Sequence, residues 1–159
     1  MAQTVNFNGI SIHPSAEESP GFLLWRVSTL WRKAIEAVLK PLGLTHPQFV
    51  VLATTAWLTR RGDKVSQVEI GKQAALDPNT ISQILRGLQT KGLIERSHTN
   101  KRSKYPILTP IGVENLAKAM RAVESADVTF FASVDVEESK ILKTLQILAR
   151  SESLKKEKE

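Results

Sequence analysis

Residues 76–109 of this chain read LDPNTISQILRGLQTKGLIERSHTNKRSKYPILT. Asp77 is a preferred N-cap residue, and Pro78 supplies the backbone angle of a first helical position. The apolar residues that follow recur at helical spacing, at Ile81, Ile84, Leu85 and Leu88. Gly92 can end this helix in a left-handed conformation, and the stretch behind it has two β-prone segments around a polar tip. A capped helix followed by a basic hairpin is the pattern of a winged helix-turn-helix.

The face of this helix opposite its apolar stripe is polar and carries no acid. A rotation of about 100° per residue places Asn79, Gln83, Arg86 and Thr90 there, with Thr80 and Ser82 on the shoulders. Side chains of these types hydrogen-bond base edges and phosphates, and Arg86 or Gln83 is suited to bidentate contacts with guanine or adenine. A solvated polar face is the simpler interpretation of the helix alone, because most amphipathic helices have one.

The distribution of charge favours nucleic acid as the partner. The chain has 22 Lys and Arg residues, 16 Asp and Glu residues, and a net charge of +6. Between residues 60 and 104, ten basic residues stand against four acidic ones, so this segment accounts for the whole net charge. A basic surface localised in this way attracts phosphates. A membrane surface is the rival target, but no basic amphipathic helix with a strong apolar face is present.

The whole chain sets limits on the class of protein. Its 159 residues are enough for one compact core, and no apolar run approaches the roughly 20 residues that span a bilayer. With no signal-peptide pattern at the N-terminus, we expect a cytoplasmic protein without membrane contact. The chain has no cysteine, and its histidines (His13, His46 and His98) form no close cluster with acids. No nucleophile motif surrounds the serines, so we expect neither an enzyme nor a metal or other cofactor.

The residues before the recognition helix predict a polar arm and three helices. Gly and Pro residues, among them Pro20, are expected to interrupt any regular element in the arm. A long amphipathic helix over about 22–39 follows. Capping boxes at Thr45–Gln48 and Ser66–Glu69 then open one helix to about residue 58 and a short one to about residue 73. This short helix and the recognition helix make the helix-turn-helix.

The residues after the recognition helix predict the wing and two more helices. Strands are expected over 93–97 and 104–108, around the polar tip. A helix over 110–131 follows, and a capping box at Asp135–Glu138 opens a last helix that ends near residue 150.

The expected fold class is therefore mainly α, a winged helix-turn-helix with a two-stranded wing hairpin. The N- and C-terminal helices carry more apolar surface than such a lobe needs, so we expect them to form the dimerisation region of a homodimer. The expected divisions are a polar N-terminal arm (1–21), a single domain (22–150) and a flexible tail (151–159). Within the domain, the DNA-binding lobe covers about 45–109 and the dimerisation helices about 22–40 and 110–150.

Three motifs, in this order and at this spacing, resemble those of the MarR family of transcriptional regulators. They are LGLTHPQF at 42–49, KGLIER at 91–96 and LTPIG at 108–112, within a resemblance that covers about 22–150. The resemblance implies a homodimer on double-stranded DNA with a pseudo-palindromic operator, with recognition helices in successive major grooves and wings over the flanking minor grooves. The family's wing tip usually carries an Asp-x-Arg element. Here Asn100-Lys101-Arg102 stands in its place, so Arg102 is retained but has only a neutral partner.

These observations predict a sequence-specific DNA-binding regulator, a repressor released by a small-molecule effector. The predicted DNA contacts are Asn79, Thr80, Ser82, Gln83, Arg86, Asn100, Lys101, Arg102 and Lys104. Because many members of the family bind small aromatic carboxylates or phenolic compounds, the resemblance also implies effector candidates, which are Trp25, Arg26, Trp31, Arg32 and Trp57. Tryptophans at helical spacing belong more often to a core or a dimer interface. The alternative function is a winged helix that contacts proteins without binding DNA.

Overall fold

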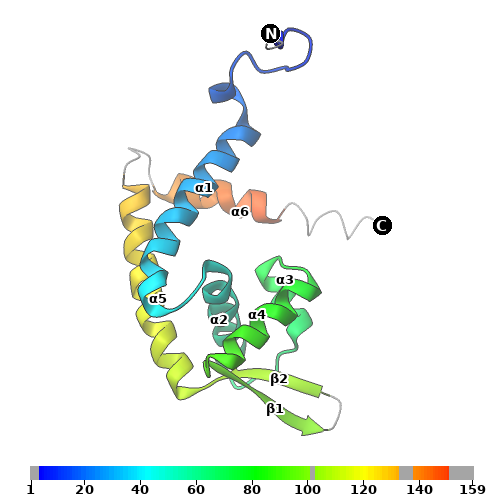
Figure 1. Ribbon diagram of the computed structural model, residues 1–159, viewed down its shortest axis with the longest axis vertical. Helices are drawn as coiled ribbons and strands as arrows, with labels where there is room; N and C mark the ends of the chain where they lie inside the picture. The colour runs from blue at the N-terminus through cyan, green and yellow to red at the C-terminus, as the bar shows by residue number, and fades with distance from the viewer. Residues whose placement is uncertain (1–3, 101–102, 133–137, 151–159) are drawn as a thin grey trace.

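The computed structural model describes residues 4–100, 103–132 and 138–150, without the side chains of 97–100, 103–104 and 138–139 (Figure 1). The described part is mainly helical with one two-stranded antiparallel sheet, as the sequence predicts. The N-terminus lies at one end of an elongated molecule and the winged lobe at the other. The elements are η1 (Ala16–Glu18), α1 (Pro20–Leu39), η2 (Lys40–Leu42), α2 (His46–Thr59), α3 (Gln67–Ala74), α4 (Pro78–Thr90), β1 (Ile94–Asn100), β2 (Ser103–Leu108), α5 (Pro110–Phe131) and α6 (Glu138–Arg150).

The helix starts follow from capping side chains. In α2 the Thr45 hydroxyl accepts from the Gln48 backbone N–H, and the Gln48 side chain accepts from the Thr45 N–H in return. Ser66 and Glu69 repeat this exchange at α3. Both predicted capping boxes are confirmed, whereas the one predicted at Asp135–Glu138 extends outside the described residues. Since each box satisfies backbone donors that a helix leaves unpaired, it fixes where the helix begins.

Helix α1 begins two residues earlier than the sequence predicts. Pro20 was expected to interrupt regular structure, but it occupies the first turn of α1, and the Ser19 hydroxyl accepts from the Phe22 N–H at 3.4 Å. Proline fits this position because its fixed φ is helical and its missing N–H would have no partner in the first turn. The expectation for Pro20 was therefore wrong.

One apolar core joins α1 and α5 to the helices α2, α3 and α4 and to the base of the wing. Its fully buried side chains come from α1 to α5 and from the start of β1, among them Ile35, Leu39, Leu52, Ile70, Ile81, Leu85, Leu88, Ile94 and Ala119. Helix α2 packs against α1, α3, α4, α5 and β2, so it is the centre of this core. Burying a Leu or Ile side chain stabilises a fold by about 1.5–3 kcal/mol, so this cluster holds the recognition helix against α2.

Two glycines are required at the base of the wing. Gly92 has φ of +69°, which lets the Leu93 N–H bond the Leu88 carbonyl at 3.0 Å in the predicted left-handed helix ending. Gly112, in the first turn of α5, lies so close to Leu93 that an added Cβ would be 1.9 Å from the Leu93 carbonyl oxygen. No other residue fits at Gly112 without a backbone shift, so α5 and the wing base are tightly joined.

The wing is longer than the sequence predicts. β1 pairs with β2 from Ile94–Leu108 to Asn100–Ser103, with a register shift between His98 and Asn100. The expected strands ended at residue 97 and began again at residue 104, because the polar tip has little β propensity. Ladder hydrogen bonds join backbone groups, so pairing that starts at the apolar base can continue into this polar stretch.

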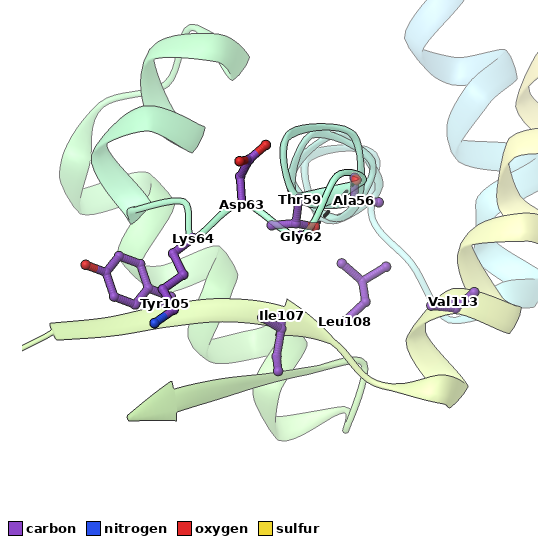
Figure 2. A pocket seen from close by; sticks show the side chains of 9 residues that line it. All are labelled: Ala56, Thr59, Gly62, Asp63, Lys64, Tyr105, Ile107, Leu108 and Val113. Atoms are coloured by element: carbon purple, nitrogen blue, oxygen red, sulfur yellow. Dashed lines mark hydrogen bonds between the residues drawn. The ribbon is translucent and has the colours of Figure 1, made fainter. Parts of the chain in front are cut away.

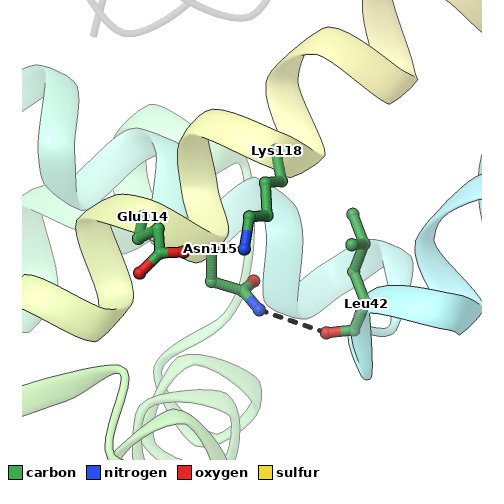
Figure 3. Close-up of polar contacts among 4 residues, drawn as sticks. All are labelled: Leu42, Glu114, Asn115 and Lys118. Carbon is green, nitrogen blue, oxygen red and sulfur yellow. Dashed lines mark hydrogen bonds and ion pairs between the residues drawn. The ribbon is translucent and has the colours of Figure 1, made fainter.

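Two side-chain hydrogen bonds between residues far apart in the sequence connect α5 to the first half of the chain. The Trp31 indole Nε1 on α1 donates to Asp127 Oδ1 on α5 at 2.7 Å. Asn115 Nδ2 donates to the Leu42 carbonyl in η2 at 3.2 Å, while Asn115 Oδ1 is buried and has no partner among the described residues (Figure 3). The exposed pair of Glu114 and Lys118, at 2.7 Å on the same helix, adds little to stability.

Much apolar surface outside the lobe is left uncovered. Exposed large apolar side chains lie on α1 and on α6, among them Phe22, Leu24, Trp25, Val27, Leu30, Leu142, Leu145, Ile147 and Leu148. In the parts of the chain that the structure describes, no helix combines the length and the apolar composition that crossing a bilayer requires. The uncovered apolar side chains therefore lie on α1 and α6, two of the helices for which the sequence predicts dimerisation.

Candidate nucleic-acid interface

Asp77 anchors the N-terminus of α4. Its carboxylate accepts hydrogen bonds from the backbone N–H groups of Asn79 and Thr80, each at 3.0 Å, and from the Thr80 hydroxyl. These bonds, first the one from the Thr80 side chain, lower the pKa of Asp77 below its ordinary value. The carboxylate is therefore occupied in the cap, where its negative charge also complements the helix dipole.

The outer face of α4 is exposed as the sequence predicts. Ile81, Leu85 and Leu88 are buried on the opposite face. The predicted contact residues Asn79, Gln83 and Arg86 are exposed, and Thr80 and Ser82 are half-buried beside them. Arg86 makes no ion pair within the described part of the chain. Its guanidinium is thus available to a ligand on the outside of the helix.

Thr80 differs from the other residues of this face. Its hydroxyl proton is donated to Asp77, so only its oxygen lone pairs remain for an outside partner. Thr80 is placed to hold the helix end, and any contact it makes with a nucleic acid must be as an acceptor or through its methyl group.

The other end of α4 is held by a residue that sequence reasoning missed. Lys91 Nζ donates to the Gly43 carbonyl and to Gln48 Oε1, both at 2.6 Å; we call these two bonds the Lys91 bridge. The sequence counts Lys91 only as one more basic residue of the 60–104 segment. No local pattern could identify the bridge, because its partners lie more than 40 residues away along the chain.

Of the four predicted DNA contacts in the wing, the structure describes only the backbone of Asn100 and Lys104. Asn100 and Lys104 lie on the paired strands β1 and β2, on either side of the wing tip. Their side chains lie outside the description, and Lys101 and Arg102 lie outside the described residues altogether. The backbone places the wing beside α4, joined to it through Gly92 and Leu93.

The five predicted effector residues have different surroundings. Trp31 is half-buried, bonded to Asp127 and packed edge-on against His46 with ring centroids 5.0 Å apart. Trp25 and Trp57 are exposed, at 69% and 60%. The guanidinium of Arg60 lies 3.8 Å from the Trp57 ring centroid, a favourable cation–π distance. Arg26 and Arg32 are exposed on α1.

An open pocket lies at the base of the wing, and none of these five residues lines it. Its volume is about 470 Å³, and we call it the wing-base pocket (Figure 2). It is lined by Ala56, Thr59, Gly62, Asp63, Lys64, Tyr105, Ile107, Leu108 and Val113. Sequence reasoning missed it, because its walls come from three separate stretches of the chain. Among the described residues, no three His, Asp or Glu side chains come together as a metal site would require.

Comparison with known proteins agrees with this geometry. The model of the MarR family matches residues 44–104, which hold the helix-turn-helix and most of the wing. The uncharacterized HTH-type transcriptional regulator YdcH of Bacillus subtilis (strain 168) is 35% identical over 136 residues, which are 84% of this chain and 92% of that protein. The HTH-type transcriptional repressor Rv2887 of Mycobacterium tuberculosis is 30% identical, over 82% of this chain and 93% of that one.

Solved structures extend the likeness to three dimensions. Rv2887 in complex with DNA superposes with a TM-score of 0.64 at 27% identity, over 82% of this chain and 97% of that one. CouR from Rhodococcus jostii RHA1, bound to p-coumaroyl-CoA, has a TM-score of 0.75 at 23% identity, over 87% and 94% of the two chains, which shows a shared fold. With the same elements and a relative that aligns over most of both chains, this protein belongs to the MarR family of winged helix-turn-helix transcriptional regulators.

Proposed function

We propose that this chain acts as a homodimeric repressor that binds a pseudo-palindromic duplex operator through α4 and the wing. The observation that carries the proposal is the outer face of α4. This face is exposed and has no acidic residue, and the guanidinium of Arg86 on it makes no ion pair within the described residues. The relative Rv2887 is named a transcriptional repressor, and one of its structures contains DNA. A cytoplasmic, non-enzymatic binding protein is the corresponding expectation for this chain.

Different residues take different roles on the duplex in this proposal. Base edges in the major groove are read by Gln83 and Arg86, with Asn79 and Ser82 at the sides of the contact. Thr80 contributes mainly through the cap that it forms with Asp77. Phosphate and minor-groove contacts fall to the wing, whose candidates are Asn100, Lys101, Arg102 and Lys104.

The proposed dimer uses the helices that leave apolar surface uncovered. We assign residues 22–40 and 110–150 to dimerisation and 45–109 to DNA binding, with 1–21 as an arm and 151–159 as a tail. The exposed apolar side chains of α1 and α6 support the assignment, since a twofold interface would bury them. Two copies of α4 would then read two half-sites about one helical turn apart.

Release by a small aromatic acid is the regulatory part of the proposal. Structures of Rv2887 contain salicylic acid and p-aminosalicylic acid. Trp25, Arg26, Trp31, Arg32 and Trp57 remain candidates for an effector contact from the sequence. Trp31 is the least available of the three tryptophans, because its N–H is already bonded to Asp127.

Selection of duplexes from a random library, followed by fluorescence anisotropy, tests the DNA-binding proposal. The wild-type protein should enrich a palindromic site and bind it more weakly as salt is raised. Arg86→Ala should lose about 1–3 kcal/mol on that site and much less on random duplex. Arg121→Ala removes the same charge from an exposed position on α5 and should leave both affinities nearly unchanged. If no sequence is enriched and both arginine variants behave as wild type, the winged helix serves protein contacts instead.

A further inference from the structure

Gly87 lies inside the recognition helix α4, between the residues expected to read bases and the Lys91 bridge. Glycine is less favourable than alanine inside a helix, because it loses more conformational freedom when the chain folds. Alanine at position 87 would therefore strengthen α4 if the helix were considered alone. The advantage of glycine at this position has to come from the way α4 packs against the rest of the lobe.

The missing side chain of Gly87 makes room for Gln48 on α2. Helix α4 packs beside α2 (Figure 1), and both residues are half-buried where the two helices meet. A Cβ at position 87 would lie 3.1 Å from Gln48 Nε2, which is closer than an ordinary van der Waals contact. Without a Cβ, α4 comes closer to α2 than alanine at position 87 would permit.

The Gln48 amide is held in place by two hydrogen bonds. Its Oε1 accepts from the Thr45 N–H at 3.2 Å and from Lys91 Nζ at 2.6 Å. Because the amide is planar, bonds that hold Oε1 also hold Nε2. Moving Nε2 away would weaken a capping bond of α2 or the Lys91 bridge. We therefore expect a methyl group at position 87 to displace α4 rather than Gln48.

Gly87 is also close to the side chains that are expected to read bases. It follows Arg86 directly, and Gln83 lies one helical turn before it on the same side of α4. A bidentate contact with a base edge needs two well-aligned hydrogen bonds at once, and hydrogen bonds weaken steeply when their angle changes. A change in the tilt of α4 should thus affect base contacts more than the attraction to phosphates, which depends mainly on charge.

We propose that Gly87 is a positioning residue for DNA recognition. Its lack of a side chain seats α4 against the Gln48 amide, and this contact sets the tilt at which Gln83 and Arg86 enter the major groove. The inference rests on the proposed function, because it concerns how the recognition helix is held for its operator. Gly87 contacts no base in this arrangement and acts through the position of its neighbours.

Operator binding by Gly87→Ala tests the proposal. Fluorescence anisotropy compares the duplex that wild type selects from a random library with a random duplex of the same length. The variant should bind the selected duplex about tenfold or more weakly than wild type, because base contacts are misaligned. It should bind the random duplex within about twofold of wild type, with the same salt dependence.

Gly21→Ala is the matched control, since it makes the same substitution in another helix. Gly21 lies in the first turn of α1, and a Cβ there would meet no neighbouring atom within 4 Å. Gly21→Ala should bind both duplexes as wild type does.

A second substitution shows whether the effect passes through Gln48. Gln48→Ala removes the atom that the new methyl group would meet. This variant keeps the bond from Lys91 to the Gly43 carbonyl, so it should still prefer the selected duplex. On the Gln48→Ala background, Gly87→Ala should weaken binding of the selected duplex by less than about threefold. A loss as large as on the wild-type background would mean that residue 87 acts on DNA binding without Gln48, and it overturns the proposal.

Thermal unfolding shows whether each variant is folded. The unfolding midpoint of Gly87→Ala should stay within a few degrees of wild type, because the gain in helix propensity offsets the strained contact with Gln48. If Gly87→Ala does not fold, recovery of folding in Gln48→Ala/Gly87→Ala supports the contact, and failure to recover overturns it.

The same measurements separate this inference from the proposed function. If wild type selects an operator and Gly87→Ala binds it equally well, the inference fails and the proposed function stands. An equal loss of affinity for the selected and the random duplex also overturns the inference, because a changed tilt should affect base contacts first. If wild type selects no duplex, the proposed function fails, and the inference fails with it.

Discussion

Ala75 has a left-handed backbone, with φ of +53°, in the turn between α3 and α4. In a residue with a Cβ, this conformation costs about 1–2 kcal/mol of steric strain, whereas glycine adopts it without that strain. We expect Ala75→Gly to raise the free energy of unfolding by about 0.5–1 kcal/mol, after the greater freedom of glycine in the unfolded chain is deducted. Urea unfolding measures the change.

Ala74→Gly is the matched control, because Ala74 is the last residue of α3 and has an ordinary helical backbone. This substitution should lower the free energy of unfolding by about 0.5–1 kcal/mol. Equal destabilisation by the two substitutions would mean that residue 75 is not left-handed in solution.

His46, the first residue of α2, titrates abnormally. Burial lowers its pKa below the ordinary value of 6.5, and Arg32 adds to the shift, while Glu36 and Asp127 oppose it. The unfolded chain therefore takes up this proton at a higher pH than the folded chain. As a result, the contribution of His46 to stability is fully present above pH 6.5 and is lost as the pH falls toward the lower, folded pKa.

When the pH is lowered from about 7.5 to about 5.5, the free energy of unfolding of wild type should fall. We expect the same change in pH to lower the free energy of unfolding of His46→Gln by less. Urea unfolding at the two pH values measures both differences. The carboxylates with lowered pKa, Asp77, Glu69 and Glu114, titrate in a more acidic range and are common to both proteins. If the free energy of unfolding of His46→Gln falls as much as that of wild type between the two pH values, a group other than His46 causes the fall.

At the scale of elements, the Lys91 bridge joins the end of the recognition helix to the start of α2. Gln48 Oε1, which accepts from Lys91, also accepts from the Thr45 N–H in the capping box. The position of α4 is thereby linked to the junction between α1 and α2. We therefore expect Lys91 to affect DNA binding through the position of α4 rather than through a phosphate contact.

A double-mutant cycle in urea tests the bridge. Lys91→Met and Gln48→Ala should each lower the free energy of unfolding by about 1 kcal/mol, a modest value because Lys91 is exposed. Together they should cost less than the sum by about 0.5 kcal/mol or more, because they remove a shared bond. The salt dependence of DNA binding by Lys91→Met should equal that of wild type. Additive costs, with a shallower salt dependence, would instead make Lys91 a phosphate contact.

At the scale of the whole molecule, the uncovered apolar side chains of α1 and α6 should decide the oligomeric state. Leu145, 47% exposed, lies on the apolar face of α6 with Leu142 and Leu148. We expect Leu145→Asp to cost the dimer several kcal/mol, because it places a charge in the interface. Light scattering at micromolar concentration should show a wild-type dimer and a variant monomer.

Lys143→Asp places the same carboxylate on the side of α6 opposite this apolar face and should leave the dimer intact. A wild-type protein that is monomeric at micromolar concentration would remove the dimer, and with it the expectation of a palindromic operator.

What the sequence determined by itself was the local structure. The capping boxes at Thr45 and Ser66, the Asp77 cap and the Gly92 ending depend on residues within about five positions of one another, so their residue types predict them directly. The apolar stripe of α4 likewise implies its exposed polar face. The MarR motifs added the family and the winged fold.

Only the tertiary structure decided which distant residues meet. The Lys91 bridge, the Trp31–Asp127 bond and the wing-base pocket each join stretches more than 40 residues apart. The same holds for the close approach of Gly112 to Leu93, which depends on how α5 packs against the wing. Helical and strand periodicity report which face of an element is apolar, but the partner of that face is set by the packing of the whole core, which no local pattern encodes.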